Sequence, residues 1–377
     1  MKRVLLTFCC LISLFAKAEF INIGILNSQS IEKFSFSVRA GKYTLFTEQG
    51  KVQEFNSDDQ VFIQKNGTEI QVFLGKRSLG TFKKVNLMGT GWYNHFMIKS
   101  LKPSMLDKRY DDNLRIKVRR GKMQLINNID LDNYVAGVVE AEVGRKPPRE
   151  YFKLQAIICR TYALSNTHKH LEQGYNLCDE VHCQAYHGKT FYPPIVDASM
   201  QTRGAVIVDS DIQLITAAFH SNCGGQTVNS EDVWTKSLYY LRSVRDTFCL
   251  NKKNSLWEHE IALPDWEQFI IRRNQLPKDS LPTSYVASNR KNDFLSTQIR
   301  FEEFRHHFGL RSTFFDVYPQ RQSVMLKGRG YGHGVGLCQE GAMEMAAQGY
   351  NYSEILHFYY SGVHIIDLSA LDFFKEE

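Results

Sequence analysis

The sequence lacks any apolar run that approaches the roughly 18–20 residues of a membrane-spanning helix. It also lacks internal repeats and low-complexity tracts, and only 9 of its 377 residues are proline. Hydrophobic residues make up 43% of the chain and charged residues 23%, which excludes a disordered or collagen-like protein. The composition therefore predicts a globular protein that buries a substantial core and has no integral membrane segment.

Nucleotide-binding motifs are also absent. No Gly-x-x-x-x-Gly-Lys-Ser/Thr loop occurs, and the glycine-rich segment 328–336 does not fit the dinucleotide fingerprint. A large excess of positive charge is missing too, because the formal charge of +6 falls to +3 without the three basic residues of segment 1–18. We therefore expect neither a nucleotide-dependent enzyme nor a nucleic-acid partner.

The first eighteen residues have the pattern of a secretory signal peptide. Lys2 and Arg3 precede an apolar run from Val4 to Phe15, and Ala16-Lys17-Ala18 is a small-x-small cleavage site. We expect an exported protein, in the periplasm or the cell wall, that begins near Glu19. Six cysteines remain after cleavage, and outside the cytosol this even number favours disulfides whose pairing the sequence leaves open.

The chain divides by its texture into a β-rich region over residues 19–125 and a mixed region over 126–377. Short apolar or alternating runs predict strands in the first region, at Ile21–Leu26, Phe34–Val38, Tyr43–Phe46, Val61–Ile63, Glu69–Leu74 and Leu114–Val118. Residues 250–325 carry no chemical signature and are expected to be a variable insertion. The predicted fold class is α+β.

Helical patterns begin after residue 130. Asp130 and Asp132 are expected to cap a short helix that Gly144 ends. A longer helix is predicted from Pro147-Pro148 to a stop at Gly174. Strands are predicted at 205–208 and 215–219, then a helix up to Gly349 and a capped helix that opens with Asn351 and Glu354.

Two glutamates, Glu140 and Glu142, end the apolar run of the first predicted helix. A carboxyl group packed against apolar neighbours loses hydration, so its pKa rises and it can donate a proton near neutral pH. The alternative is that both are exposed acids at a helix end.

A cysteine- and histidine-rich segment follows. Cys178, His182, Cys183 and His187 offer two thiols and two imidazoles within ten residues, a set that zinc accepts. The spacing is not the usual Cys-x-x-Cys, and Cys178 and Cys183 are equally able to close a small disulfide loop. Both readings stay open.

Two polar, glycine-rich segments complete the candidate site. His220 and Ser221 follow a predicted strand and face a glycine turn, and Cys223 next to them is a conceivable nucleophile. Between Gly328 and Gly336, glycines alternate around His333. Such a backbone either admits a chain-like ligand closely or forms a tight packing corner.

Taken in order, these motifs resemble the stage II sporulation protein D family, also called SpoIID/LytB. The resemblance covers roughly residues 126–250 and 325–366. The matching segments are Tyr134–Glu142, Lys153–Ala163, Gln184–Tyr186, Phe219–Asn229, Glu231–Trp234, Tyr240-Leu241 and Gly328–Gly341. The family pattern differs after Glu142, where Val143 and Gly144 replace its usual methionine and proline.

The resemblance implies an exported protein that binds peptidoglycan glycan strands. It assigns the catalytic acid to Glu142 and gives Arg160 the role of holding substrate or the glutamate. The other residues that we expect to bind substrate are Gln184, Tyr186, His220, Ser221, Gly330, Gly332, His333 and Gln339. The family also favours a structural zinc near the Cys/His segment, with no cofactor needed for the chemistry. Cys223 and Cys338 stand where the family has small hydroxyl residues, and we expect them to bond to each other.

The resemblance implies a lytic transglycosylase that cuts between N-acetylmuramic acid and N-acetylglucosamine on strands without stem peptides. One alternative is a non-catalytic wall-binding protein whose partner is a cell-wall amidase that it stimulates. Another is a zinc or thiol hydrolase built on the cysteine and histidine clusters.

Overall fold

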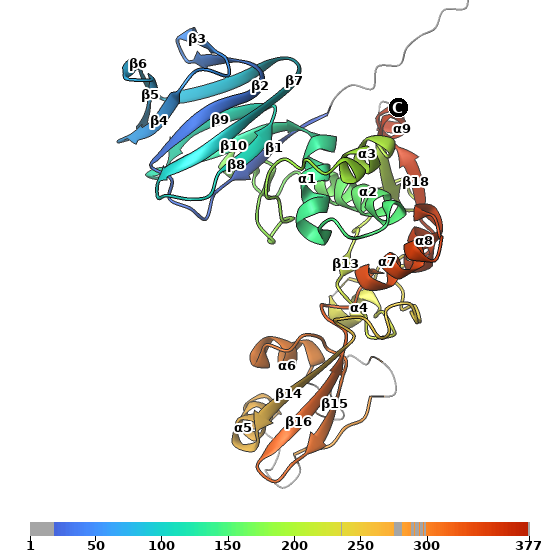
Figure 1. The fold of residues 1–377 in the computed structure, drawn as a ribbon. Helices are drawn as coiled ribbons and strands as arrows, with labels where there is room; N and C mark the ends of the chain where they lie inside the picture. The colour runs from blue at the N-terminus through green and yellow to red at the C-terminus, as the bar shows by residue number, and fades with distance from the viewer. Residues whose placement is uncertain are drawn as a thin grey trace, which may run out of the picture.

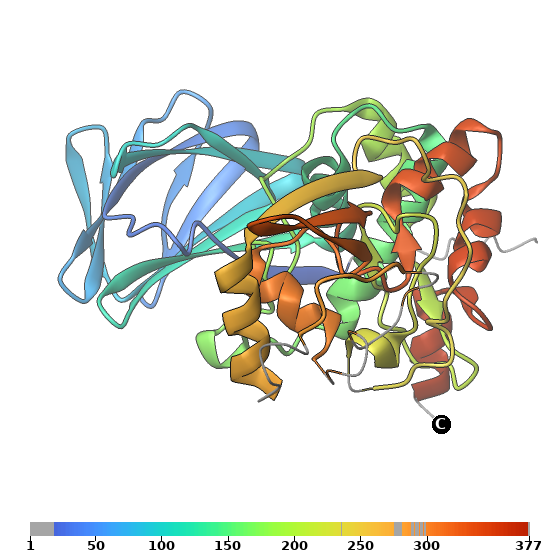
Figure 2. The same ribbon diagram turned by 90° about the horizontal axis from the view of Figure 1, so that it is seen from below.

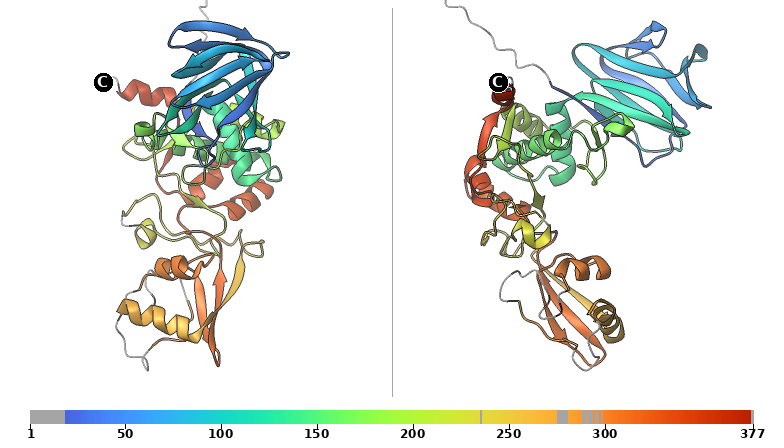
Figure 3. Two further views of the ribbon diagram at one scale, coloured as in Figure 1. Left: turned by 90° about the vertical axis from the view of Figure 1, so that its left-hand side faces the viewer. Right: turned by 180° about the vertical axis from the view of Figure 1, so that it is seen from behind.

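The computed structural model describes residues 19–234, 236–274, 281–287, 290, 294, 297 and 299–375, so the expected signal peptide over 1–18 lies outside the described residues. A β-rich part, a helical core and an inserted unit follow one another in space. Figures 1 and 3 place the β-rich part and the inserted unit at opposite ends, with the helical core between them. The α+β prediction is confirmed.

One large sheet forms the N-terminal part, in the order β11-β1-β10-β9-β7-β2-β4-β5-β6, with β3 paired to β2 and β8 to β7. Its strands are β1 (Phe20–Ile25), β2 (Lys33–Thr47), β3 (Gly50–Phe55), β4 (Val61–Asn66), β5 (Glu69–Leu74), β6 (Arg77–Phe82), β7 (Lys84–Lys102), β8 (Lys108–Asp111), β9 (Asn113–Arg119) and β10 (Lys122–Asp130). The predicted strands are present, except that 34–38 and 43–46 are one strand, β2, whose register shifts against β7 near Ala40.

Alternation fixes which face of β9 is buried. Leu114 and Ile116 are fully buried, whereas Arg115 and Lys117, which alternate with them, keep solvent contact. This follows from the two-residue repeat of a strand. The same core continues into the first helix through Leu131 and Tyr134, so the sheet and the helical core share one apolar cluster.

The helical core is built around α2. It packs against α1, α3, α7, α8 and β12. Its elements are α1 (Leu131–Val143), α2 (Arg149–Ser165), a 3-10 turn (Leu171–Gln173), β11 (Leu177–Cys178), α3 (Pro193–Gln201), β12 (Ala205–Val208), β13 (Phe219–His220), α4 (Ser230–Val233), β17 (Leu337–Cys338), α7 (Gln339–Ala347), α8 (Tyr352–Tyr359), β18 (His364–Asp367) and α9 (Leu368–Lys375).

The predicted helix boundaries are partly confirmed. Asp130 caps α1 by accepting from the backbone N–H of Asp132 and Asn133, and Gly144 follows its last residue. Asn351 and Glu354 form the capping box of α8. The predicted stop at Gly174 is wrong, because α2 ends at Ser165 and Gly174 closes only the 3-10 turn. The strand expected at 215–219 is reduced to β13.

Residues 256–329 form the inserted unit. It consists of β14 (Leu256–Ala262), α5 (Leu263–Asn274), α6 (Phe301–Phe308), β15 (Phe315–Pro319) and β16 (Ser323–Arg329), with the strand order β14-β16-β15. Its own aromatic cluster surrounds the buried Trp266. Figure 2 shows the unit in front of the helical core, with the N-terminal sheet extending to one side.

The domain boundary expected at 125/126 falls inside β10, which runs on to Asp130 and leads directly into α1. The segment after α2 also returns to the N-terminal sheet, since β11 pairs in parallel with β1. Among the described residues, none of the helices has the length and apolar character to span a bilayer.

Candidate functional site

Glu142 lies in the last turn of α1 and is partly buried. Its Oε1 accepts a hydrogen bond of 3.0 Å from the backbone N–H of Ala185, in the loop after β11. Its Oε2 has no hydrogen-bond partner among the described residues and is not among the side-chain atoms sealed from solvent. Burial raises the pKa of this carboxyl above its ordinary value, and the Ala185 hydrogen bond lowers it to a smaller extent.

The surroundings of Glu142 come from α2 and α7. Burial is the main cause that raises the pKa of the Tyr151 phenol and of the Cys159 thiol, and the negative charge of Glu142 adds to the rise in both. The side-chain amide of Gln339, the first residue of α7, lies close to Tyr151, and its Nε2 is buried without a hydrogen-bond partner among the described residues. The structure thus brings Gln339 and Glu142 around one tyrosine, although segments 197 residues apart in sequence carry them.

Glu140 has a different environment, although only one residue separates it from Glu142. Its Oε1 accepts from Nε of Arg145 at 2.5 Å, in an ion pair whose arginine is largely exposed. Residues two apart on a helix point in different directions. Glu142 therefore stands as a single carboxyl, as the sequence predicts, while Glu140 is neutralised at the surface.

The role expected for Arg160 is wrong. Its side chain is fully buried, and its Nε and Nη2 donate to Oδ1 of Asp132 at 2.9 and 2.6 Å. The remaining donors go to the carbonyl oxygens of Ser199 and Ala205. Arg160 ties α1, α2, α3 and β12 together, so it contacts neither solvent nor Glu142.

Tyr186 and Gln184 are likewise core residues rather than exposed substrate ligands. The Tyr186 ring packs against Tyr134 and Tyr110, and its hydroxyl donates to Asn127. Gln184 is buried, and its Oε1 lies 3.5 Å from the Tyr134 hydroxyl. Their segment still matters, because it carries the Ala185 N–H that holds Glu142.

His220 and His333 form a second group, apart from Glu142. Their rings lie 5.5 Å apart; Nδ1 of His220 bonds the Val335 carbonyl and Nε2 of His333 bonds the Phe219 carbonyl. Burial lowers the pKa of His220 well below 6.5 and that of His333 to about 4. Both rings are neutral, and no hydrogen bond or ring contact joins them to Glu142 within the described part of the chain.

The alternating glycines form a packing corner, and the expectation that Gly330 and Gly332 bind substrate stays a prediction. Both have positive φ angles, of 81° and 109°. A Cβ at Gly330 would lie 2.5 Å from the Asn222 carbonyl oxygen, and one at Gly332 would lie 2.9 Å from Cβ of His220. The loops therefore pack against each other. Ser221 belongs to the same corner, since its hydroxyl accepts from Asn254 at 3.0 Å.

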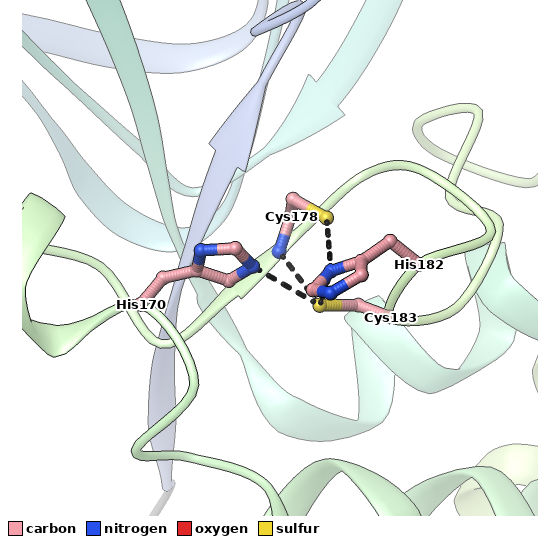
Figure 4. A group of neighbouring side chains, drawn as sticks. All are labelled: His170, Cys178, His182 and Cys183. Atoms are coloured by element: carbon pink, nitrogen blue, oxygen red, sulfur yellow. Dashed lines mark hydrogen bonds between the residues drawn. The ribbon is translucent and has the colours of Figure 1, made fainter.

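The cysteine and histidine segment forms a compact donor group, shown in Figure 4. Donor atoms of His170, Cys178, His182 and Cys183 all lie within 4.8 Å of one another. Sγ of Cys183 is 3.4 Å from Nε2 of His170 and 3.7 Å from Nδ1 of His182, which is 3.9 Å from Sγ of Cys178. Zinc bonds of about 2.0–2.3 Å need donors about 3.3–3.8 Å apart in a tetrahedron, so this group fits zinc.

The ligand set differs from the expected one at one position. His187 is exposed and outside the group, whereas His170, eight residues before Cys178, is inside it. His170 was not predicted, because it comes near Cys178 only through the 3-10 turn that follows it. Cys178 and Cys183 are free thiols rather than a disulfide. A hydrogen bond from Cys183 lowers the pKa of Cys178 to about 4 and raises that of Cys183.

Cys223 is not paired with His220, so the cysteine nucleophile is wrong. Its Sγ lies 3.3 Å from Sγ of Cys249 and 3.3 Å from Oδ2 of Asp246. The expected disulfide between Cys223 and Cys338 is also not formed, because both are free thiols.

Comparison with known proteins agrees with these motifs. The family model "SpoIID: Stage II sporulation protein" matches residues 119–208, which include α1, α2 and the donor group. The chain is 28% identical to stage II sporulation protein D of Bacillus subtilis over 68% of this chain and 80% of that protein. It is also 28% identical to an uncharacterised protein of Brachyspira hyodysenteriae, over 66% and 70% of the two chains.

A further relative is the amidase enhancer of Bacillus subtilis, 26% identical over 60% of this chain and 39% of that protein. The inserted unit and most of the N-terminal sheet lie outside the family match. The resemblance predicted from the motifs is confirmed, because residues 119–208 match the SpoIID family model.

Proposed function

We propose that this chain is an exported peptidoglycan lytic transglycosylase whose single acid is Glu142. The observation that supports it most is a partly buried carboxyl with a raised pKa, one oxygen held by the Ala185 N–H and the other open. A general acid needs a protonated oxygen, and Oε2 is the carboxyl oxygen that has no hydrogen-bond partner in the described part of the chain.

The reaction uses this one carboxyl twice. Protonated Glu142 donates its proton to the oxygen that joins N-acetylmuramic acid to N-acetylglucosamine, and the bond from C1 to that oxygen breaks. The carboxylate then takes the proton of the muramic 6-hydroxyl, whose oxygen bonds to C1 and closes a 1,6-anhydro ring. No water enters, so the second carboxylate of a hydrolytic glycosidase is not required. Glu140 is unsuited to that role because Arg145 holds it.

A structural zinc at the donor group of His170, Cys178, His182 and Cys183 would support this acid indirectly. Cys183 lies two residues before Ala185, whose N–H holds Oε1 of Glu142. Zinc bound by four protein donors leaves no open position for substrate, so its contribution is to fix the loop. The catalytic steps themselves need only Glu142 and the sugar.

The test is digestion of stem-free glycan strands followed by mass spectrometry of the products. Wild type should release 1,6-anhydro species, and Glu142→Gln should lower the rate by about 10²–10⁴-fold because its amide cannot donate the proton. Glu140→Gln, two residues away on the same helix turn, is the matched control and should stay within about twofold of wild type. Products heavier by one water would show hydrolysis and refute the transglycosylase.

The similarity to an amidase enhancer favours one rival, a wall-binding protein that stimulates an amidase without cutting glycan. The two proposals separate on the same variant. If amidase stimulation is the function, Glu142→Gln should stimulate a purified cell-wall amidase as well as wild type does, and neither protein should release anhydro sugars.

A further inference from the structure

Four buried side chains that the proposed reaction does not use meet at the junction of the helical core and the inserted unit. Cys223 follows β13, Asp246 and Cys249 lie in the segment before β14, and Cys338 ends β17. All four are buried, with Cys223, Asp246, Cys249 and Cys338 each at 0% exposure. Three separate stretches of chain therefore bring three thiols and a carboxylate to one enclosed point.

The spacing of these donors suits a small tetrahedral ion. One ligand atom from each residue lies within 4.8 Å of the other three. Sγ of Cys223 is 3.3 Å from Sγ of Cys249 and 3.3 Å from Oδ2 of Asp246. Donors around zinc lie about 3.3–3.8 Å apart, whereas a disulfide bond is about 2.05 Å long.

The carboxylate of Asp246 is oriented as a metal ligand is. Its Oδ1 accepts from the backbone N–H of Phe248 at 2.9 Å and of Cys249 at 3.3 Å. Its Oδ2 faces the sulfur atoms and accepts from the Tyr359 hydroxyl at 2.9 Å. Hydrogen bonds of this kind from outside the ligand shell orient metal-binding carboxylates.

Space at this point is kept by a glycine. Any Cβ at Gly341, in the first turn of α7, would collide with Oδ2 of Asp246 and with the Tyr359 hydroxyl. The Asp246 carboxylate and the Tyr359 hydroxyl therefore occupy the space that a side chain at position 341 would need.

The negative charge of Asp246 and the odd number of thiols favour a bound cation over a disulfide. A disulfide uses two thiols, leaves the third unpaired and provides nothing to neutralise a buried carboxylate, whose burial is costly without a positive partner. Arg290 lies nearby, but its Nη1 donates to the Cys223 carbonyl at 3.3 Å rather than to Asp246. Three thiolates with one carboxylate form a ligand set that suits zinc among the common metal ions.

We propose that Cys223, Asp246, Cys249 and Cys338 bind a second, structural zinc ion. Four protein donors fill the tetrahedron, so the site is closed and takes no substrate. The ion fastens the loop after β13, the entry to the inserted unit and the start of α7. Gln339, the residue next to Cys338, approaches Tyr151 beside Glu142, so the same ion would fix one wall of the candidate site.

The test measures zinc in the purified mature chain, by elemental mass spectrometry against protein concentration, for single variants. Cys249→Ser and Asp246→Asn should each lower the zinc content by about one ion per chain, and His170→Ala should lower it separately by about one. Cys159→Ser changes a buried thiol outside both groups and should keep the wild-type zinc content. An unchanged zinc content in Cys249→Ser and Asp246→Asn would overturn the proposal.

Peptide mapping of the wild-type protein without reductant is a second test of the proposed zinc site, and it does not require any variant to fold. After alkylation of the unfolded chain, the peptides with Cys223, Cys249 and Cys338 should all carry the label. A disulfide between any two of them would refute the second zinc. Neither result bears on Glu142, because digestion of glycan tests the proposed reaction independently.

Discussion

Glu142, His220 and His333 are titratable groups that are wholly or partly buried in the same SpoIID-like core, and their hydrogen bonding differs. Each histidine uses a ring nitrogen on a backbone carbonyl of the other loop, so the rings fasten β13 to the glycine-rich corner. Glu142 uses one oxygen and leaves the other open. The comparison teaches that partners, rather than burial alone, separate a structural group from a reactive one.

Arg160 gives the clearest test of a structural group, whose polar atoms are bonded within the protein. Arg160→Met should destabilise the fold by about 3–5 kcal/mol, because it leaves Asp132 buried without its main partner. The matched control is Arg203→Met, since Arg203 pairs with the other oxygen of Asp132 at 3.1 Å but is 41% exposed. Chemical denaturation measures both. The control should lose no more than about 1 kcal/mol, and equal losses would contradict the assignment.

The histidines should make the fold sensitive to acid. Burial lowers the pKa of His333 from 6.5 to about 4, so its contribution is complete above pH 6.5 and is lost as the pH falls toward 4. We expect a loss of about 2 kcal/mol across this window, after allowance for the partial exposure of the ring. In His333→Gln the slope should become shallower by the His333 contribution, while the part due to His220 remains. His364→Gln, at an exposed position, should keep the wild-type slope in denaturation at several pH values.

Glu142 should show the reverse slope. Burial raises its folded-state pKa above 4.5, so its protonated form stabilises the fold below pH 4.5 and that contribution is lost as the pH rises through the folded pKa. Glu142→Gln should therefore be more stable than wild type at pH 7, by about 1.4 kcal/mol for each unit of the shift, and equal to it below pH 4.5. A variant less stable at pH 7 would show that Glu142 is a structural group.

Glu140 should give the smallest effect. Its ion pair with Arg145 is at the surface, where such pairs contribute about 0–1 kcal/mol. Raising the salt concentration should therefore change the stability of wild type and Glu140→Gln by nearly the same amount. A large loss of stability in this variant would show that Glu140 is a structural group rather than a surface acid.

Local patterns predicted what depends on neighbours in sequence. The β-rich region, the Asp130 cap and the strand face at Leu114 follow from composition and spacing, whereas the choice of Glu142 over Glu140 came from the family resemblance. Those features are set by repeats of two and 3.6 residues and by hydration, which a single sequence records.

Long-range placement was beyond the sequence. The burial of Arg160 depends on carbonyl groups about 40 residues away, and the packing of Gly330 depends on Asn222, more than 100 residues earlier. His170 joins the donor group only because the chain turns back before β11. The core of the inserted unit is a cluster of aromatic rings without a motif, so it too was missed.

The pairing of β14 with β16 sets Leu256 directly opposite Arg329, and the backbone N–H of Gly330 donates to the Ser255 carbonyl at 2.9 Å. Entrance and exit of the inserted unit are thus neighbours. The inserted unit is joined to the core at one point, so evolution could add, shorten or exchange it without changing the path of the helices around Glu142. The segment that enters the inserted unit carries Cys249, and the segment that leaves it leads to Cys338. Both cysteines belong to the proposed second zinc site next to this junction.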